Sequence, residues 1–122
     1  MAIQYEMSTA GHVMTVVASG SDEDLNEVQN YGLAIIEKAK QSGCHKILCN
    51  ELQLEYRLNT LDTFEAAEFI SRYAPSVGRV AIACDPRFIK DAQFWETVAV
   101  NRGTVVRVFP DLAEATRWLE EV

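Results

Sequence analysis

The three cysteines and two histidines are the first residues whose types could do chemistry. Cys44, His45 and Cys49 lie close together, and thiolates with imidazoles bind zinc. A zinc site needs about four ligands, however, and the only other histidine, His12, falls on a different predicted strand. Neighbouring side chains of a strand point to opposite faces, so Cys44 and His45 do not form a nucleophile and base pair. We therefore expect buried thiols, with no metal and no cofactor.

Polar side chains at the ends of predicted strands form a second candidate set. Ligands of open α/β sheets gather at the carboxyl ends of parallel strands, which places four side chains at one rim: Ser21, Asn50, Asp85 and Asp111. Such a rim could hold a magnesium ion, but Asn50 stands where a receiver-type site needs an aspartate. Ser21, Asp85 and Asp111 also stand where helices need N-caps. Capping is the favoured interpretation, and an enzyme that uses this rim is the least favoured function class.

The elements that position these residues follow from hydrophobic spacing and from helix caps. Alternation predicts strands, and apolar residues three or four apart predict helices. Ser21 with Asp24 predicts a cap for the first helix, which Gly43 ends, and Pro75 stops the second helix. The predicted strands are residues 3–7, 12–19, 46–50, 79–84 and 104–109, and the predicted helices are residues 21–43, about 61–74, 86–101 and 111–119.

This order of elements predicts the fold class. Strands separated by helices need crossover connections, which produce parallel strand pairs with right-handed connections. The first two strands have only a short turn between them, at Ala10 and Gly11, so the first strand pairs antiparallel at an edge. The sequence therefore predicts a single α/β domain over residues 1–122, with a five-stranded, mostly parallel sheet and four helices.

Four segments carry a resemblance to a known group of proteins. After the hairpin come KILCN, RVAIACD, FWETVAVNRG and VVRVFPDLAEATRWL. Together they resemble the SpoIIAA-like group, which is related to STAS domains and more distantly to the CRAL-TRIO lipid-transfer fold. The resemblance covers nearly the whole chain. It implies a β-α superhelix that serves in binding and regulation.

The most specific part of this resemblance is the turn Asn101-Arg102-Gly103. The turn closes a helix, so we expect Gly103 to take the left-handed conformation and its amide to bond the last helical carbonyls. Arg102 is a cation in a last helical turn, where it interacts favourably with the helix dipole. Anion or partner binding by Arg102 is the alternative.

A threonine stands where the resembling proteins carry a regulatory site. STAS antagonists of anti-sigma factors have an Asp-Ser-(Ser/Thr)-Gly turn at the start of the helix after the third strand, and its first serine is phosphorylated. Here residues 57–63 read RLNTLDT, with no glycine and with Thr60 as the nearest hydroxyl. A phosphate at Thr60 would lie near a helix N-terminus, which tolerates negative charge. The simpler interpretation is that Thr60 or Asp62 is a helix cap.

Charge and hydropathy exclude several function classes. Asp and Glu number 18 against 11 Lys and Arg, which gives a formal net charge of -7, and both halves of the chain are negative. Affinity for a phosphate backbone comes mainly from Lys and Arg, so we expect no nucleic-acid partner.

The sequence contains no run of about 18 apolar residues, so we expect no membrane span, and the first residues lack the pattern of a signal peptide. An odd number of cysteines fits reduced thiols, so we expect a cytoplasmic protein.

Surplus apolar side chains on two predicted helices are the most informative feature. A helix that buries one face has an apolar arc of about 100°. Five residues fall outside the core-facing arcs of their helices: Ala66, Phe69, Tyr73, Phe94 and Val98. An apolar arc wider than this indicates that the helix buries a second face. The partner that covers the second face could be another part of the chain, a second subunit or a hydrophobic ligand.

Two function hypotheses follow from these observations. The first is a non-enzymatic, cytoplasmic, STAS-like binding or regulatory module that forms a homodimer through the helix pair and interacts with a regulatory protein. The second is a carrier of a small hydrophobic ligand, such as a lipid or quinone, in a pocket between helices.

Overall fold

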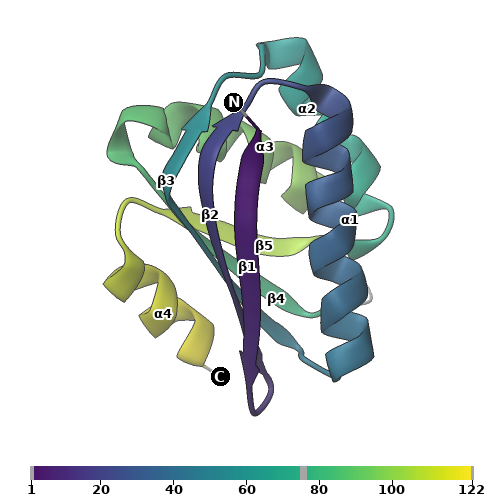
Figure 1. The fold of residues 1–122 in the computed structure, drawn as a ribbon, viewed down its shortest axis with the longest axis vertical. Coiled ribbons are helices and arrows are strands. Elements are labelled where there is room, and N and C mark those ends of the chain that lie inside the picture. Colours follow the sequence, from purple (N-terminus) through teal and green to yellow (C-terminus); the bar gives the residue numbers. More distant parts are fainter. Residues whose placement is uncertain (1, 75–76, 122) are drawn as a thin grey trace.

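A five-stranded sheet forms the centre of the computed structural model, which describes residues 2–74 and 77–121 (Figure 1). The strands lie in sequence order across the sheet. They are β1 (Ile3–Ala10), β2 (Val13–Asp22), β3 (Lys46–Tyr56), β4 (Arg79–Cys84) and β5 (Val105–Phe109). β1 pairs antiparallel with β2, and the other neighbours pair parallel. The predicted α/β class and mostly parallel sheet are therefore confirmed.

Helices cover both faces of this sheet. They are α1 (Leu25–Ser42), α2 (Thr60–Ser71), α3 (Ile89–Asn101) and α4 (Leu112–Glu120), with a short 3-10 turn, η2 (Pro86–Phe88), before α3. α4 packs on one face, and α1, α2 and α3 lie on the other (Figure 1). In β4, Ala81 and Ala83 join the core beneath α4, whereas Ile82 and Cys84 join the opposite core. Burial on both faces explains the continuous apolar run of this strand.

α2 forms an outer layer over one face. α1 packs on β1 and β2 and α3 packs on β5, whereas α2 packs mainly against α1 and α3. Gly32 of α1 permits the close approach of α2, because a Cβ at that position would lie 2.4 Å from Cδ1 of Ile70. Ala66 and Ala67 of α2 are completely buried. α2 therefore roofs the space between α1, α3 and the sheet.

β3 is longer than the sequence pattern predicted. It continues to Tyr56, whereas the prediction ended it at Asn50. The last residues of β2, from Ser19 to Asp22, pair with Gln53 to Tyr56 after an irregularity in the register. The segment ELQLEY was predicted to be irregular, although its polar and apolar residues alternate as they do in a half-buried strand. Backbone pairing with the end of β2 keeps this segment in the sheet.

Two helix starts also differ from prediction. Ser21 lies buried within β2, and Asp24 takes the N-cap position of α1, so a cap at Ser21 was wrong. Asn59 caps α2, because its side chain accepts a 2.8 Å hydrogen bond from the amide of Asp62. Thr60 is then the first helical residue. α2 ends at Ser71, and the predicted stop at Pro75 lies outside the described residues.

Candidate functional site

A cavity lies between the sheet and the helices α1, α2 and α3. Its volume is about 130 Å³. The walls are mostly aliphatic and come from both layers, and Trp95 of α3 adds an aromatic surface. Representative apolar lining residues are Val28, Ile35, Ile47, Ile70, Ile82 and Val106. Because α2 roofs this space without packing closely on the strands, the cavity follows from the layered arrangement of the helices.

A buried carboxyl group interrupts the apolar wall. Glu51 of β3 is only 7% exposed. The hydroxyl of Tyr31 donates a 2.7 Å hydrogen bond to its Oε2, and the hydroxyl of Tyr56 donates to its Oε1. We call these three residues the tyrosine–glutamate cluster. Buried polar groups are stable only when they are hydrogen-bonded, and the two tyrosines supply these bonds.

Three different elements position the tyrosine–glutamate cluster. Glu51 lies two residues after Cys49 and four after Ile47, so strand alternation places all three on the cavity face of β3. Tyr31 comes from the middle of α1. Tyr56 ends β3, and its ring packs against that of Phe88 with centroids 5.8 Å apart. The cluster therefore joins α1, β3 and the 3-10 turn before α3.

Burial changes the proton affinity of these groups. It raises the pKa of the Glu51 carboxyl, and the hydrogen bonds from Tyr56 and Tyr31 only partly offset that rise. Burial, followed by the charge of Glu51, raises the pKa of both tyrosines well above the usual value. Asp22 is a second lining carboxyl group. Burial raises its pKa to about 7, although the amide of Arg57 donates a hydrogen bond to it.

The buried cysteines near Glu51 are inert thiols. Burial, and then the charge of Glu51, raises the pKa of Cys84 to about 11 and that of Cys49 well above its usual value. A thiol needs its thiolate form to act as a nucleophile, and that form is disfavoured here. Their burial and raised pKa therefore disfavour a nucleophilic role for these two thiols, whereas the carboxyl groups of the site can accept hydrogen bonds.

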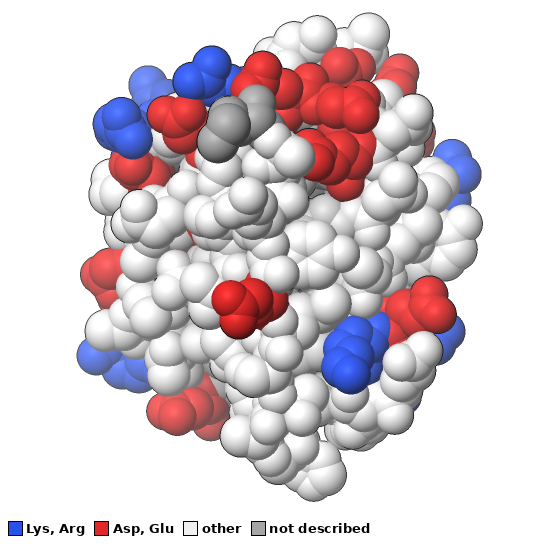
Figure 2. All heavy atoms as spheres, in the orientation of Figure 1, with Lys and Arg blue, Asp and Glu red and all other residues white. Residues whose placement is uncertain are grey.

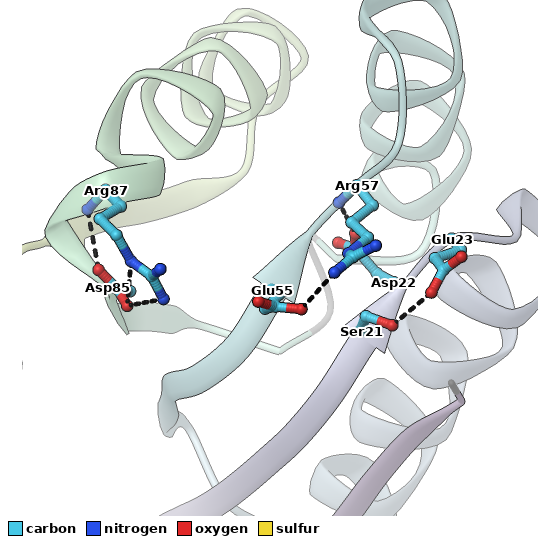
Figure 3. Close-up of polar contacts among 7 residues, drawn as sticks. All are labelled: Ser21, Asp22, Glu23, Glu55, Arg57, Asp85 and Arg87. Atoms are coloured by element: carbon cyan, nitrogen blue, oxygen red, sulfur yellow. Dashed lines mark hydrogen bonds and ion pairs between the residues drawn. The ribbon is translucent and has the colours of Figure 1, made fainter.

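The carboxyl edge of the sheet carries exposed polar pairs (Figure 3). Arg57 pairs with Glu55 at 2.8 Å, and Arg87 pairs with Asp85 at 2.9 Å. Acidic side chains gather at the same end of the molecule, the upper end in Figure 2. Exposed ion pairs contribute little to stability, so this edge is chiefly a solvated, negatively charged rim.

Comparisons with solved structures place this architecture among known folds. No protein-family model matches the chain, and no curated protein matches it. A crystal structure of an anti-sigma factor antagonist from Mycobacterium paratuberculosis matches with a TM-score of 0.67 at 12% identity, covering 98% of this chain and 96% of that one. The unphosphorylated anti-sigma factor antagonist SpoIIAA matches with a TM-score of 0.57 at 15% identity, over 98% of this chain and all (100%) of that one. The chain has a SpoIIAA-like fold.

A third structure supports the same assignment. It is an uncharacterised protein of the DUF3478 family from Shewanella loihica PV-4, described as having a SpoIIAA-like fold. Its TM-score is 0.59 at 14% identity, covering 97% of this chain and 93% of that one. The sequence resemblance is thus confirmed at the level of the fold. The more distant kinship with the CRAL-TRIO fold stays a prediction.

Within the SpoIIAA-like fold, the four predicted rim residues have different roles. Asp85 and Asp111 are caps, as predicted, because each side chain accepts a hydrogen bond from a backbone amide two or three residues ahead, at 2.9 and 2.8 Å. Asn50 accepts a 3.2 Å hydrogen bond from an amide of its own strand. Ser21 donates a 2.7 Å hydrogen bond to Glu23 and caps no helix. The rim is therefore largely occupied by local bonds.

The five surplus apolar residues divide into buried and exposed members. Ala66 is 0% exposed and Val98 is 6% exposed, so neither is available as a surface. For these two residues the second burial partner is another part of the chain, one of the three alternatives left open by the sequence, because α2 and α3 also pack on each other. Ala66 lines the cavity. Phe69 is half-buried, while Tyr73 and Phe94 are 46% and 37% exposed.

The turn after α3 has the predicted backbone. Gly103 has a φ of +94°, and its amide donates a 3.0 Å hydrogen bond to a carbonyl of α3. Asn101 is the last residue of α3. Arg102 binds Glu68 of α2 at 2.9 Å, and its guanidinium lies 5.2 Å from the ring centre of Phe64. Arg102 therefore connects the end of α3 to α2, a contact that the sequence pattern did not predict.

The histidines and cysteines first considered for metal binding make separate contacts and do not come together at one site. His12 and His45 lie side by side with ring centres 6.2 Å apart, and Cys44 and Cys49 are buried free thiols. Over residues 2–74 and 77–121, no group of three or more His, Cys, Asp or Glu side chains is arranged to hold a metal ion. None of the helices in those ranges is long and apolar enough to cross a membrane.

Sequence reasoning missed the tyrosine–glutamate cluster. None of its three residues is among the candidate site residues predicted from the sequence. One signal was available: if the alternation of Ile47 and Cys49 is extended, Glu51 falls on the buried face. A buried acid requires partners, but the sequence could not identify them because Tyr31 lies 20 residues away on another element.

Proposed function

We propose that this chain is a non-enzymatic regulatory module that acts by binding another protein. The observation that carries this proposal is the similarity of its fold to two anti-sigma factor antagonists over nearly the full length of each chain. A shared fold alone does not transfer a function, so the proposal also needs a surface that could bind.

The N-terminal end of α2 is the proposed docking surface. Thr60 is exposed at the first position of the helix, and Leu61 beside it is 66% exposed, the highest value among the large exposed apolar side chains of the described residues. Asn59 caps the helix, so Thr60 is not needed for capping. A phosphate on Thr60 would lie at the positive end of the helix dipole. Thr60 is therefore the proposed phosphoacceptor that would regulate docking.

Titration with purified anti-sigma factors from the same genome tests this function. We expect one of them to bind, and we expect Leu61→Thr to weaken that binding by about tenfold or more. Val105→Thr makes the same kind of change at a 52% exposed apolar residue on β5, and it should leave binding unchanged. Absence of binding to every candidate, or equal losses in both variants, would overturn the proposal.

A homodimer through α2 and α3 is part of the proposal. Phe69 and Tyr73 form an edge-to-face ring pair with centres 5.5 Å apart on α2 and the residues after it, and Phe94 of α3 is also partly exposed. Aromatic side chains are enriched in protein interfaces. Light scattering should give the mass of a dimer, and Phe94→Ser should shift it to that of a monomer. A concentration-independent monomer would exclude this part.

The alternative function is carriage of a hydrophobic ligand. The cavity supports this function, and the cavity volume limits the size of the ligand. A cavity of about 130 Å³ is close to the ~150 Å³ apolar cavity that holds benzene. A lipid chain or a tailed quinone is several times larger than benzene. A ligand of the size of one ring is therefore the form of this alternative that fits.

A further inference from the structure

We propose that the cavity beneath α2 binds a small apolar amine, about the size of one aromatic ring, whose protonated nitrogen contacts the carboxylate of Glu51. This site lies beneath α2, whereas the proposed protein-docking surface lies at the exposed start of α2. The two proposals therefore stand or fall separately.

The apolar walls and the volume define the body of the ligand. The lining is dominated by aliphatic side chains, with the indole of Trp95 on the α3 side. Apolar cavities take up apolar molecules of matching size. The volume of about 130 Å³ corresponds to one ring with a short substituent.

The titratable groups of the wall define the polar end of the ligand. The cavity is lined by three carboxyl groups, those of Asp22, Glu51 and Asp91, and its described lining contains no Lys, Arg or His. The two tyrosine hydroxyls donate to different oxygens of Glu51. A carboxylate has about four acceptor positions, so roughly two stay open, and an ammonium group has only donors to offer.

Over residues 2–74 and 77–121, Glu51 has no positively charged partner. The ion pairs Arg57–Glu55, Arg87–Asp85 and Arg102–Glu68 all lie elsewhere. A buried charge without a counter-charge is costly. A cation held in the cavity would lower that cost, whereas an anionic ligand would increase it.

A second side chain of the wall has an unused hydrogen-bonding group. Thr104 is 6% exposed, and its hydroxyl has no hydrogen-bond partner among the described residues. Thr104 precedes Val106 and Val108 by two and four residues, and all three line the cavity. Buried hydroxyls are normally paired, so this hydroxyl is a second polar point of the wall. It lies six register positions, about 20 Å, from Glu51, so a ligand the size of one ring would not contact both groups.

A matched series of ligands tests the proposal on the wild-type protein. Benzylamine, benzyl alcohol, toluene and benzoate share one ring and differ at the polar end. We expect benzylamine to raise the melting temperature most and to bind about tenfold or more tightly than benzyl alcohol, with no effect of benzoate. Equal binding of benzylamine and benzyl alcohol, binding of benzoate, or no binding at all would overturn the proposal.

Two variants and a spectroscopic signal locate the binding. Glu51→Gln should reduce benzylamine affinity about tenfold or more and leave toluene affinity unchanged, whereas Glu55→Gln, a matched change on the exposed part of β3, should alter neither. In a Trp118→Phe background, Trp95 is the only remaining tryptophan, and its fluorescence should change on binding. If Glu51→Gln fails to fold, the comparison of benzylamine with benzyl alcohol on the wild-type protein still tests the proposal. Benzylamine binding without a Trp95 signal would place it outside the cavity and overturn the proposal.

Discussion

The hydroxyl of Tyr31 on α1 donates a 2.7 Å hydrogen bond to Oε2 of Glu51 on β3. Both residues are buried, at 8% and 7% exposure, so neither polar group can exchange this bond for one with water. The bond therefore couples the position of α1 to the second half of β3 and forms part of the cavity wall.

Tyr31→Phe removes this donor and leaves the carboxyl group buried. A buried hydrogen bond that loses one partner costs about 1 to 3 kcal/mol, so we expect the free energy of unfolding to decrease by that amount. Urea denaturation measures the change. Tyr5→Phe is the control, because Tyr5 is 40% exposed and packs on Tyr31 through its ring. Equal effects of the two substitutions would contradict the assigned bond.

Asp22 should make stability depend on pH. Its pKa is raised from 3.8 to about 7 in the folded protein, so between these values the folded state holds a proton that the unfolded state has released. The stabilisation that Asp22 contributes is therefore fully present below the pKa of this group in the unfolded state, 3.8. It is lost as the pH rises through about 7, the pKa in the folded state.

Asp22→Asn removes this titration while its amide oxygen can still accept the hydrogen bond from Arg57. Relative to wild type, the variant should gain at least about 1.4 kcal/mol of stability between about pH 5 and pH 8, the free energy of one pKa unit. Urea denaturation at both pH values checks this. A parallel pH profile in the two proteins would mean that Asp22 titrates normally.

Gly103→Val should destabilise the protein through the backbone alone. Gly103 has a φ of +94°, and a Cβ there would meet no atom within 4 Å, so strain and not a steric clash sets the cost. The expected loss is about 1 to 3 kcal/mol by thermal or urea denaturation. Gly103→Asn should cost less, because asparagine tolerates the left-handed region better than valine. If Gly103→Val leaves the free energy of unfolding unchanged, the turn can rearrange to avoid the strain.

Thr104→Val should stabilise the ligand-free protein. The substitution replaces a buried, unpartnered hydroxyl with a methyl group of similar shape, which removes a desolvation cost of about 1 kcal/mol. Thr63→Val is the comparison, because the hydroxyl of Thr63 donates a 2.9 Å hydrogen bond to the carbonyl of Asn59. A loss of stability in Thr104→Val would reveal a partner for its hydroxyl.

Local patterns in the sequence were sufficient for the architecture. Alternating strands and helices required parallel pairing, the apolar run of β4 predicted an inner strand, and Asp85, Asp111 and Gly103 marked helix ends. Each of these features depends on interactions within a few residues or on a rule of chain connection. Such features can be predicted without knowing what packs against them.

The cavity and its polar cluster were decided by tertiary structure. β3 extends beyond Asn50 because Glu51 pairs with Cys84 of β4 and because the last residues of β2 pair with Gln53 to Tyr56. Ala66 and Val98 are buried because α2 and α3 pack on each other, although single-helix periodicity placed both on an outer face. Burial depends on which elements meet in space, and no periodicity within one element contains that information.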